Sequence, residues 1–359
     1  MIDVRIHRAS QADRQRWDDY VLSHPAGTAY QLFAWQEAVA SAYGFHACSL
    51  LASDTMRLRG VLPFSVFRCR PLSNYLISLP YCDAGGVLAD DAEMAALLLQ
   101  RSRLLALQAE AGWQLRSLTP QADAGANHSD KARLVLELPS TMQELLAGLK
   151  AKVRSQVNKP GRDGLKVRFG AAELLDDFYR IFAENMRDLG SPVHHRRWFA
   201  ALLAAYGCRA QIAVVDTPAG EPAAAAILLL HPVTAVVPWA SCLRRFNHLN
   251  ANMLLYRGLL SRAIEQGCQR FDFGRSTPGS GTWRFKLQWG AEPQPLYWYQ
   301  LRSSELLAAP AASDPPAQSA GLARRLVPVG RQLAETLWTR MPLPAANVLG
   351  PAIRKHIAL

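Results

Sequence analysis

Paired cysteines are absent from this sequence. The six cysteines of the 359-residue chain lie at positions 48, 69, 82, 208, 242 and 268, and no two of them have CxxC spacing. No group of Cys and His residues has the spacing of zinc ligands. The sequence therefore predicts free thiols in a reducing compartment, and it offers no site for a resident metal or cofactor.

Long hydrophobic runs are scarce as well. The first ten residues carry charge where a signal peptide needs an apolar segment, which predicts a cytoplasmic protein. One uncharged segment, residues 222–243, is long enough to span a bilayer. Its middle contains His231 and Pro232, and proline breaks a helix interior. We therefore interpret this segment as two buried strands joined by a turn.

Acidic residues are outnumbered. The chain has 40 Lys and Arg against 29 Asp and Glu, a formal net charge of +11. Such a balance favours acidic partners, for example nucleic acid, anionic lipid or phosphorylated substrates. Apolar residues make up 50% of the chain, so it can bury cores, and its length suits two domains.

Two parts of the chain repeat one order of predicted elements, β-α-α-β-β-β-α-β. The first copy covers residues 1–139 and the second covers residues 161–302. Copies of one plan without visible sequence identity indicate a pseudo-duplicated α/β protein. We expect the two halves to superpose and to enclose a central cleft.

A basic connecting helix is predicted between the copies, over residues 140–160. Thr141 and Glu144 have capping-box spacing, and Pro160 is expected to end the helix. Apolar residues recur every four positions and predict one buried face: Leu145, Leu149, Val153 and Val157. The basic residues of segment 150–168 form either a solvated helix face or an edge that binds phosphate: Lys150, Lys152, Arg154, Lys159, Arg162, Lys166 and Arg168.

The C-terminal end has two predicted parts. Residues 303–320 are rich in Ala, Pro and Ser and indicate a linker, and residues 321–359 indicate a basic amphipathic tail. Its apolar positions form a rough helical stripe: Leu322, Leu326, Leu333 and Leu337. This tail either packs on its own domain or makes peripheral contact with the inner membrane.

The repeated order resembles the acyltransferase fold of the GNAT superfamily. In that fold, a glycine-rich loop after the fourth strand holds the pyrophosphate of coenzyme A at a helix N-terminus. The corresponding text here, RRFNHLNANMLL at residues 244–255, contains no glycine. This departure disfavours an ordinary acetyl-CoA enzyme.

Residues 250–293, NANMLLYRGLLSRAIEQGCQRFDFGRSTPGSGTWRFKLQWGAEP, resemble the signature region of the FemAB family. Members of that family have two GNAT-like domains and transfer amino acids from aminoacyl-tRNA to peptidoglycan precursors. The chain is most similar to the FemAB-like proteins of exosortase/PEP-CTERM systems, whose tail resembles MPLPAANVLGPAIRKHIA at residues 341–358. It lacks the long helical arm that is associated with tRNA contact in some Fem ligases.

The resemblance implies an acyl- or aminoacyltransferase of cell-envelope, peptidoglycan or exopolysaccharide synthesis. Its donor would be an aminoacyl-tRNA or an acyl thioester, and its acceptor an amine-bearing envelope precursor. Two alternatives remain open at this point. One is a CoA-dependent N-acyltransferase of the GNAT type, and the other is a non-catalytic binding protein of an exopolysaccharide assembly.

Lys286 is the first catalytic candidate. Phe285 and Lys286 match the Phe-Lys pair that Fem-type enzymes have at the transfer centre, which implies that Lys286 stabilises the carbonyl oxygen while Phe285 and Trp283 form a dry wall. We expect Lys286 on the floor of the largest cleft of the second domain. In the alternative interpretation, Phe285 and Trp289 form the apolar face of a core helix and Lys286 points to solvent.

Asp272 is the second catalytic candidate. It alternates with Phe271 and Phe273 on a predicted strand, so it faces away from both, and it either accepts the amine proton or makes a structural hydrogen bond. The predicted substrate-binding residues near it follow the strand or belong to the next helix and to the matching loop of the first half: Arg275, Ser276, Asn250, Tyr256, Tyr81 and Asp83.

Overall fold

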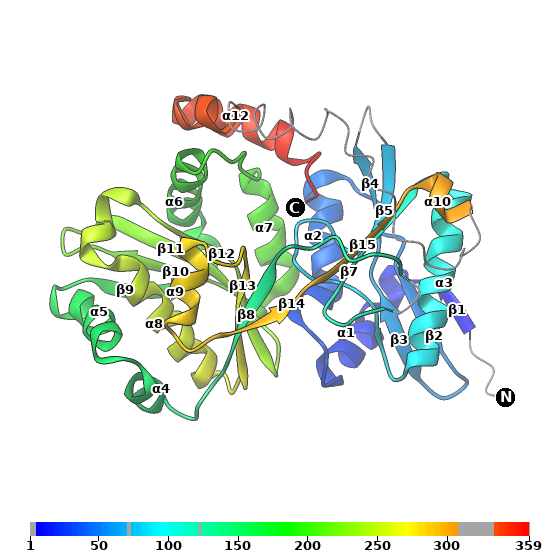
Figure 1. Cartoon of the computed structure of the whole chain (residues 1–359), viewed down its shortest axis with the longest axis horizontal. Helices are drawn as coiled ribbons and strands as arrows, with labels where there is room; N and C mark the ends of the chain where they lie inside the picture. The colour runs from blue at the N-terminus through cyan, green and yellow to red at the C-terminus, as the bar shows by residue number, and fades with distance from the viewer. Residues whose placement is uncertain (1–4, 70–72, 122–123, 308–333, 359) are drawn as a thin grey trace.

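Two α/β units lie side by side in the computed structural model (Figure 1), which describes residues 5–69, 73–121, 124–307 and 334–358. The elements of the first half are β1 (Arg5–Arg8), α1 (Arg14–Ser23), α2 (Phe33–Tyr43), β2 (Leu50–Ser53), β3 (Leu58–Leu62), β4 (Ser65–Cys69), β5 (Ser73–Ile77), β6 (Leu88–Ala89), α3 (Ala92–Gln108) and β7 (Gly112–Ser117).

The elements that follow are β8 (Ala132–Glu137), α4 (Met142–Gly148), α5 (Ala151–Arg162), β9 (Lys166–Gly170), α6 (Leu175–Asp188), α7 (Arg196–Tyr206), β10 (Ala210–Asp216), β11 (Pro222–Leu230), β12 (Thr234–Cys242), α8 (Ala251–Glu265), β13 (Arg270–Ser276), α9 (Gly281–Leu287), β14 (Glu292–Pro295), β15 (Tyr297–Leu301), α10 (Ser303–Leu307) and α12 (Leu343–Arg354).

The second half is built on a seven-stranded sheet of order β14-β8-β13-β12-β11-β10-β9. Helices α6 and α7 pack on one face of it, and α4, α5 and α8 pack on the other. Alternate residues of β11 enter the two cores: Ala225, Ile227 and Leu229 on one face, and Ala224, Ala226 and Leu228 on the other. Because both faces of β11 are buried, the uncharged run at 222–243 is a pair of core strands, as predicted.

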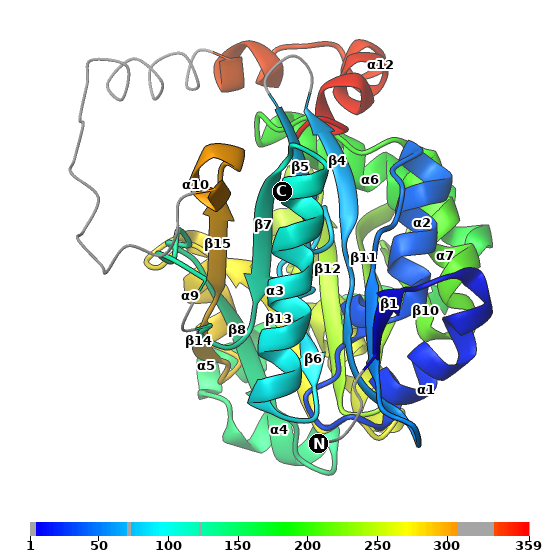
Figure 2. The ribbon, with the colours of Figure 1, turned by 90° about the vertical axis from the view of Figure 1, so that its right-hand side faces the viewer.

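The first half has two four-stranded sheets, of order β1-β2-β3-β6 and β15-β7-β5-β4. Helix α3 lies across one face of them (Figure 2), and α1 and α2 pack on the other face. The core under α1 and α2 is continuous with the core under α6 and α7, because α2 packs against α7. One apolar core therefore extends through both halves.

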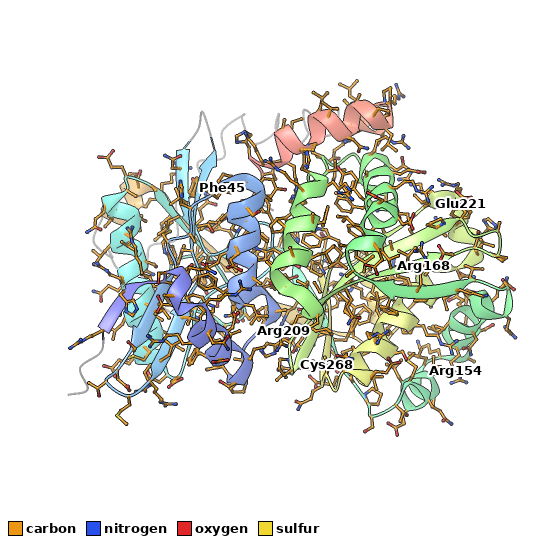
Figure 3. The ribbon with its side chains drawn as sticks, turned by 180° about the vertical axis from the view of Figure 1, so that it is seen from behind. Phe45, Arg154, Arg168, Arg209, Glu221 and Cys268 are labelled. Atoms are coloured by element: carbon orange, nitrogen blue, oxygen red, sulfur yellow. The ribbon has the colours of Figure 1, made fainter. Side chains whose placement is uncertain are left out.

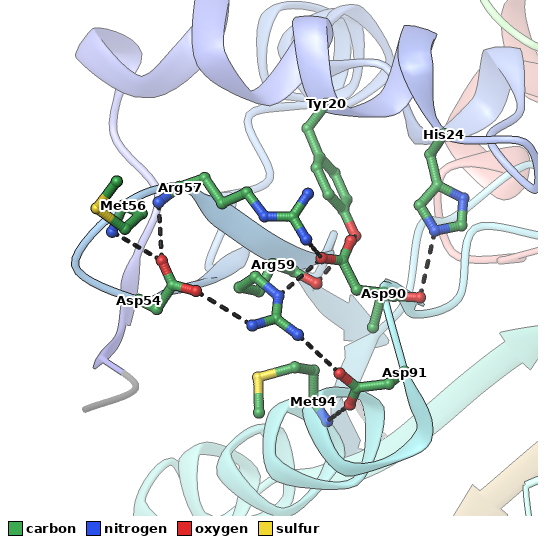
Figure 4. Close-up of polar contacts among 10 residues, drawn as sticks. Tyr20, His24, Asp54, Met56, Arg57, Arg59, Asp90, Asp91 and Met94 are labelled. Carbon is green, nitrogen blue, oxygen red and sulfur yellow. Dashed lines mark hydrogen bonds and ion pairs between the residues drawn. The ribbon is translucent and has the colours of Figure 1, made fainter. Parts of the chain in front are cut away.

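An arginine with three carboxylate partners fixes the outer part of the first half (Figure 4). Arg59 on β3 forms ion pairs with Asp90 at 2.7 Å, Asp91 at 2.9 Å and Asp54 at 3.1 Å. Tyr20 of α1 donates a hydrogen bond to Asp90 at 2.9 Å. This network joins α1, β3 and the start of α3, so we assign it a structural role.

Each half contains one parallel strand pair with a helical crossover, β5–β7 around α3 and β12–β13 around α8. The expected fold, two tandem GNAT-like units, is confirmed. The terminal strands, however, are exchanged. We expected β8 in the first half and β15 in the second, but β8 pairs with β13 and β15 pairs with β7. Alternation of apolar residues predicts that a segment is a strand, but it does not predict which strand it pairs with. The exchange therefore could not be predicted from the sequence.

The connecting segment differs from the predicted single helix. It forms α4 and α5, separated by extended backbone at Leu149 and Lys150. Pro160 does not end α5, which continues to Arg162, because a proline near the last turn costs one hydrogen bond without stopping the chain. The predicted apolar face is confirmed, since Leu145, Leu149, Val153 and Val157 are all buried in the core of the second half.

The C-terminal part is described only in pieces. The predicted linker begins with the short helix α10, and the rest of it lies outside the described residues, as do Leu322, Leu326 and Leu333 of the predicted stripe. Leu337 is exposed, whereas α12 packs on α6 and crosses above α6 and α7 (Figure 1). The chain end then reaches the junction of the two halves, where the backbone NH of Tyr81 donates to the carbonyl of Ala358 at 2.8 Å.

Candidate functional site

Lys286 lies on α9 and is almost entirely buried, with 7% of its surface exposed. Its Nζ donates hydrogen bonds to the carbonyl oxygens of Gly274 and Arg275, both at 2.9 Å. The alternative in which Lys286 points to solvent is therefore wrong. Its neighbour Phe285 is half-buried and packs edge-on against Tyr256, with ring centroids 5.0 Å apart.

The carbonyl groups that hold Lys286 belong to a bulge in β13. The register of β13 against β8 shifts between Asp272 and Arg275, and Gly274 has a φ of +74°. A Cβ at Gly274 would lie 3.3 Å from the carbonyl oxygen of Val237, so glycine suits both the torsion and the close approach. Parallel pairing of β12 with β13 is confined to Thr234–Val236 and Arg270–Asp272, so the strands part next to this bulge.

Asp272 also binds this bulge. It is 6% exposed, and its Oδ1 accepts a hydrogen bond from the backbone NH of Gly274 at 2.8 Å. Its Oδ2 lies 3.4 Å from Nη1 of Arg133. Phe271 and Phe273 point into the core of the second half, so the predicted alternation along the strand is confirmed.

Burial moves the pKa values of Lys286 and Asp272 toward each other. Burial lowers the pKa of Lys286 to about 8, although the charges of Asp83 and Asp272 oppose the change. Burial also raises the pKa of the Asp272 carboxyl, against the opposing effect of Arg133 and the Gly274 amide. The site thus has a cation and a carboxyl group whose proton affinities both lie closer to neutrality than usual.

An ion pair between the halves completes the site. Asp83 of the first half lies 3.0 Å from Nε of Arg275, and it also accepts the backbone NH of Arg275 at 3.1 Å. Trp298 donates from its indole to the carbonyl of Asp83 at 2.9 Å, and the Arg275 guanidinium lies 5.2 Å from the Trp298 ring centroid. The loop of Asp83 therefore contacts β13 directly, and the central cleft expected between the halves stays a prediction.

A small pocket lies at this junction, lined by residues of both halves: Thr28, Ala29, Tyr30, Asp83, Ala84, Leu118, Arg133, Thr234, Val236, Asp272 and Leu296. It has about 10 Å³ of space for water centres, enough for about one water molecule. A larger open groove of about 670 Å³ lies between α5 and α8. Lys286 lines neither of them, so its place on the floor of a cleft stays a prediction.

Other predicted residues lie around this centre without contacting a common point. Ser276 is buried, and its hydroxyl has no partner among the described residues. Trp283 is half-buried, and its backbone NH donates a hydrogen bond to the hydroxyl oxygen of Ser280, the N-cap of α9. Tyr256 is stacked on Phe273 within the core, and burial raises its pKa.

Two predicted residues take up unusual backbone conformations. Asn250 precedes α8 with a left-handed φ of +55°, which asparagine tolerates, but its side chain makes no capping hydrogen bond. Tyr81 also has a left-handed φ, of +67°, and its hydroxyl donates to the carbonyl of Lys355 at 3.0 Å. Tyr81 therefore holds the C-terminal tail instead of facing the pocket.

The basic residues of α5 are partly engaged with the protein itself. Arg154, labelled in Figure 3, donates to the carbonyl groups of Ala147 at 3.1 Å and Leu149 at 2.7 Å, and so caps the end of α4. Lys159 forms an ion pair with Asp163 one turn along the helix. The open groove is lined by Arg154 together with Arg162 and Arg257, with no carboxylate among its lining residues: Ala151, Arg154, Ser155, Asn158, Gly161, Arg162 and Arg257.

Three residues of the centre were missed by sequence reasoning: Arg133, Arg116 and Trp298. Arg133 and Trp298 lie on the exchanged strands β8 and β15, which we expected in the opposite halves of the chain. Arg116 is fully buried, donates to the carbonyl of Cys82 at 2.8 Å and lies 4.9 Å from the Trp298 ring centroid. Burial lowers the pKa of Arg116 to about 10. A charged residue between Leu115 and Ser117 on a predicted strand was the one available signal for it.

The loop after β12 is a short 3-10 helix, Arg244–Leu249. Arg244 donates to the carbonyl of Asp188 at 2.7 Å, and Arg245 forms ion pairs with Glu184 and Glu221. Both arginines that could meet a pyrophosphate are thus occupied by groups of the protein.

Comparisons with known proteins agree with this architecture. Residues 148–287 match the family model of the acetyltransferase (GNAT) domain. No curated protein matches the chain. The crystal structure of FemX is similar with a TM-score of 0.68 at 15% identity, over 84% of this chain and 98% of FemX.

Two further solved structures have the same fold. The C-terminal domain of a putative lysylphosphatidylglycerol synthetase from Agrobacterium fabrum gives a TM-score of 0.55 at 15% identity, over 82% of this chain and 94% of its own. A tandem GNAT protein from the clavulanic acid biosynthesis pathway gives a TM-score of 0.53 at 11% identity, over 87% of this chain and 100% of its own. The fold is therefore GNAT-like, and the matched region contains the bulge, Asp272 and Lys286.

The described part of the chain has neither a candidate metal-binding group nor a candidate membrane-spanning helix. Those residues contain no group of three or more His, Cys, Asp or Glu side chains placed to hold a metal ion. None of the helices formed by the same residues has the length and apolar character needed to cross a bilayer.

Proposed function

We propose that this protein is an acyltransferase that moves an acyl or aminoacyl group onto an amine, with Lys286 as the cation that stabilises the reacting carbonyl oxygen. The observation that supports it most is the position of Lys286, a buried ammonium group held at the bulge where β12 and β13 part. That position lies inside the region that matches the acetyltransferase domain.

The hydrogen bonds of Lys286 leave one donor for the substrate. A lysine ammonium has three N–H groups, and two of them bind Gly274 and Arg275. No acceptor among the described residues takes the third. Attack of the amine nitrogen on the ester or thioester carbon places negative charge on the carbonyl oxygen, and the third N–H stabilises that charge.

Asp272 takes the proton in the proposed reaction. Its raised pKa makes it a better base than an ordinary carboxylate, and its side chain lines the junction pocket. As the new C–N bond forms, the amine proton passes to Asp272. The bond from carbon to the oxygen or sulfur of the donor then breaks, and the leaving group takes up a proton.

An aminoacyl ester is the donor that we favour over a CoA thioester. Arg244 and Arg245 are engaged by the protein, and the loop that contains them has no glycine for a phosphate cradle. The groove between α5 and α8 supports an RNA-borne donor instead, since its charged lining residues are all arginines and, unlike Arg245, none of them pairs with a carboxylate among the described residues. Arg257 of this groove follows Tyr256, which contacts Phe285 beside Lys286.

For the acceptor we propose an amine-bearing precursor of the cell envelope, as the resemblance to the FemAB family implies. Peptidoglycan and exopolysaccharide precursors both belong to this class. The narrower similarity to proteins of exosortase/PEP-CTERM systems stays a prediction.

The experiment offers the full-length protein two donor panels, labelled aminoacyl-tRNAs and acyl-CoA thioesters, with glycinamide as a generic amine. We expect amide product from the aminoacyl-tRNA panel and at least 100-fold less of it with Lys286→Met. Arg101→Met is the matched control, because it removes an exposed cation from α3 of the first half.

The other outcomes separate the alternatives. Product from CoA thioesters alone would establish the CoA-dependent alternative. Absence of product from both panels, with correctly folded protein, would contradict the proposal and favour a non-catalytic binding protein.

A further inference from the structure

The outward face of α12 is apolar. Val348 is 74% exposed, Leu349 48% and Ile353 43%. Ala352 is exposed between them along the same side of the helix. A helix on a protein surface normally turns its polar side to water, so α12 has the reverse orientation.

The opposite face of α12 fixes that orientation. Ala346 is fully buried, and a Cβ on Gly350 would come within 2.9 Å of both the Cγ2 and the backbone N of Val193. At the end of the helix, Arg354 donates from Nε to Nε2 of the buried His194 at 3.0 Å. Because small residues and this hydrogen bond hold the inner face, α12 cannot roll to bury its outer side chains.

Exposed large apolar side chains are concentrated on this tail. Elsewhere in the described chain they are few and separated in sequence: Met56, Leu104, Leu189 and Leu287. The tail adds Leu337, 69% exposed, to the three large residues of the α12 face. Single exposed apolar residues need no explanation, whereas a contiguous set indicates a binding surface.

The charges at the ends of α12 are basic. Arg340 precedes the helix, Lys355 follows it, and both are exposed. Glu335 is the one acidic residue between positions 334 and 358. An apolar helix face with cations at its ends complements the interface of an anionic bilayer.

We propose that the outer face of α12 binds the surface of an anionic membrane, with Val348, Leu349 and Ile353 among the acyl chains. A second copy of the chain is a poorer partner. The helix has 12 residues and is about 18 Å long, which is too short to supply the roughly 800 Å² per partner of a stable protein interface. The proposal does not depend on which group the protein transfers.

Membrane contact would also place the candidate site near the bilayer. The C-terminal end of α12 lies over the junction of the two halves (Figure 1). Tyr81 contacts Lys355 and Ala358 there, two positions before Asp83. A lipid-linked substrate at the membrane surface would therefore lie close to the junction without leaving the bilayer.

Vesicle flotation tests the proposal with the full-length protein. The probes are phosphatidylcholine vesicles with and without 30% phosphatidylglycerol, and the variant is Val348→Ser/Leu349→Ser/Ile353→Ser. We expect binding to the anionic vesicles, and about 100-fold weaker binding by the variant, since each substitution removes buried apolar area worth roughly a factor of five. Arg340→Gln/Lys355→Gln should weaken binding and reduce its dependence on salt.

The matched control is Met56→Ser/Leu104→Ser, which removes two exposed apolar side chains of the first half. It should bind as the unmodified protein does. Thermal melts show whether each variant is folded. Equal flotation of the α12 variant and the control would overturn the proposal. So would a dimer in analytical ultracentrifugation that the α12 substitutions alone dissociate, because a second copy would then cover the face.

Discussion

Substitution of Lys286 by Met separates its charge from its size. Methionine retains most of the length of the side chain but has no donor for Gly274, for Arg275 or for a developing oxyanion. Loss of one such donor costs about 3–4 kcal/mol of transition-state stabilisation, so transfer should fall by about 100- to 1000-fold.

The same substitution should change stability only modestly. Two hydrogen bonds from a charged group are lost, at about 1.5–3 kcal/mol each. Against this, the fall in the pKa of Lys286 from 10.5 to about 8 corresponds to about 3 kcal/mol spent on burying the charge. These terms oppose each other, so we expect a net change within about 2 kcal/mol in urea unfolding.

The pH dependence of the rate provides the sharper assay. Only the protonated form of Lys286 stabilises an oxyanion, so the rate of the unmodified protein should fall as pH rises through about 8. Lys286→Arg should retain part of the activity without this alkaline decrease, because a guanidinium remains charged.

The pH dependence of stability has the opposite direction. Between pH 8 and 10.5 the unfolded chain holds the extra proton, so the free energy of unfolding should rise with pH, and Lys286→Met should remove that rise. If Lys286→Met transfers at the unmodified rate with the same alkaline decrease, then Lys286 only anchors the bulge and the reasoning fails.

Three further outcomes follow from the structure. Gly274→Ala should lower the free energy of unfolding by about 2 kcal/mol in urea titration, since alanine strains the left-handed torsion, and a neutral result would mean that the bulge relaxes easily. Burial lowers the pKa values of His194 and His231, so below about pH 6.5 the unfolded chain binds more protons than the folded chain. The melting temperature should therefore fall as the pH decreases below about 6.5, and a melting temperature that does not change with pH would contradict the burial of these histidines. Arg257→Gln should weaken aminoacyl-tRNA binding and lower its salt slope by about one, whereas equal slopes would exclude the groove.

Local patterns predicted much of the fold. The spacing of Leu145 and Val157 gave the buried face of the connecting helices, and the uncharged run at 222–243 gave two core strands. The alternation around Asp272 gave the correct face of β13. These features depend on residues close together in the chain, so a single sequence contains them.

Long-range pairing accounts for what could not be predicted. Arg133 and Trp298 reach the site because β8 and β15 each pair with the sheet of the other half. The residue pattern of these strands does not differ from that of a strand that pairs within its own half. The buried state of Lys286 depends on the bulge at Gly274, more than ten residues away in sequence. The residues around Lys286 in the sequence do not indicate that its side chain binds the carbonyl groups of Gly274 and Arg275.

The strand exchange affects the order in which the protein can be made. The first-half strand β7 ends at Ser117, and its partner β15 begins at Tyr297. A ribosome that adds 5–20 residues per second reaches the end of β15 roughly 10–40 s after β7 has emerged. During that interval the edge of β7 is unpaired and can join a strand of another chain. Nascent chains should therefore need a chaperone that covers the edge of β7 until β15 has been synthesised. A chain that stops before β15 should aggregate and should not form a stable first half.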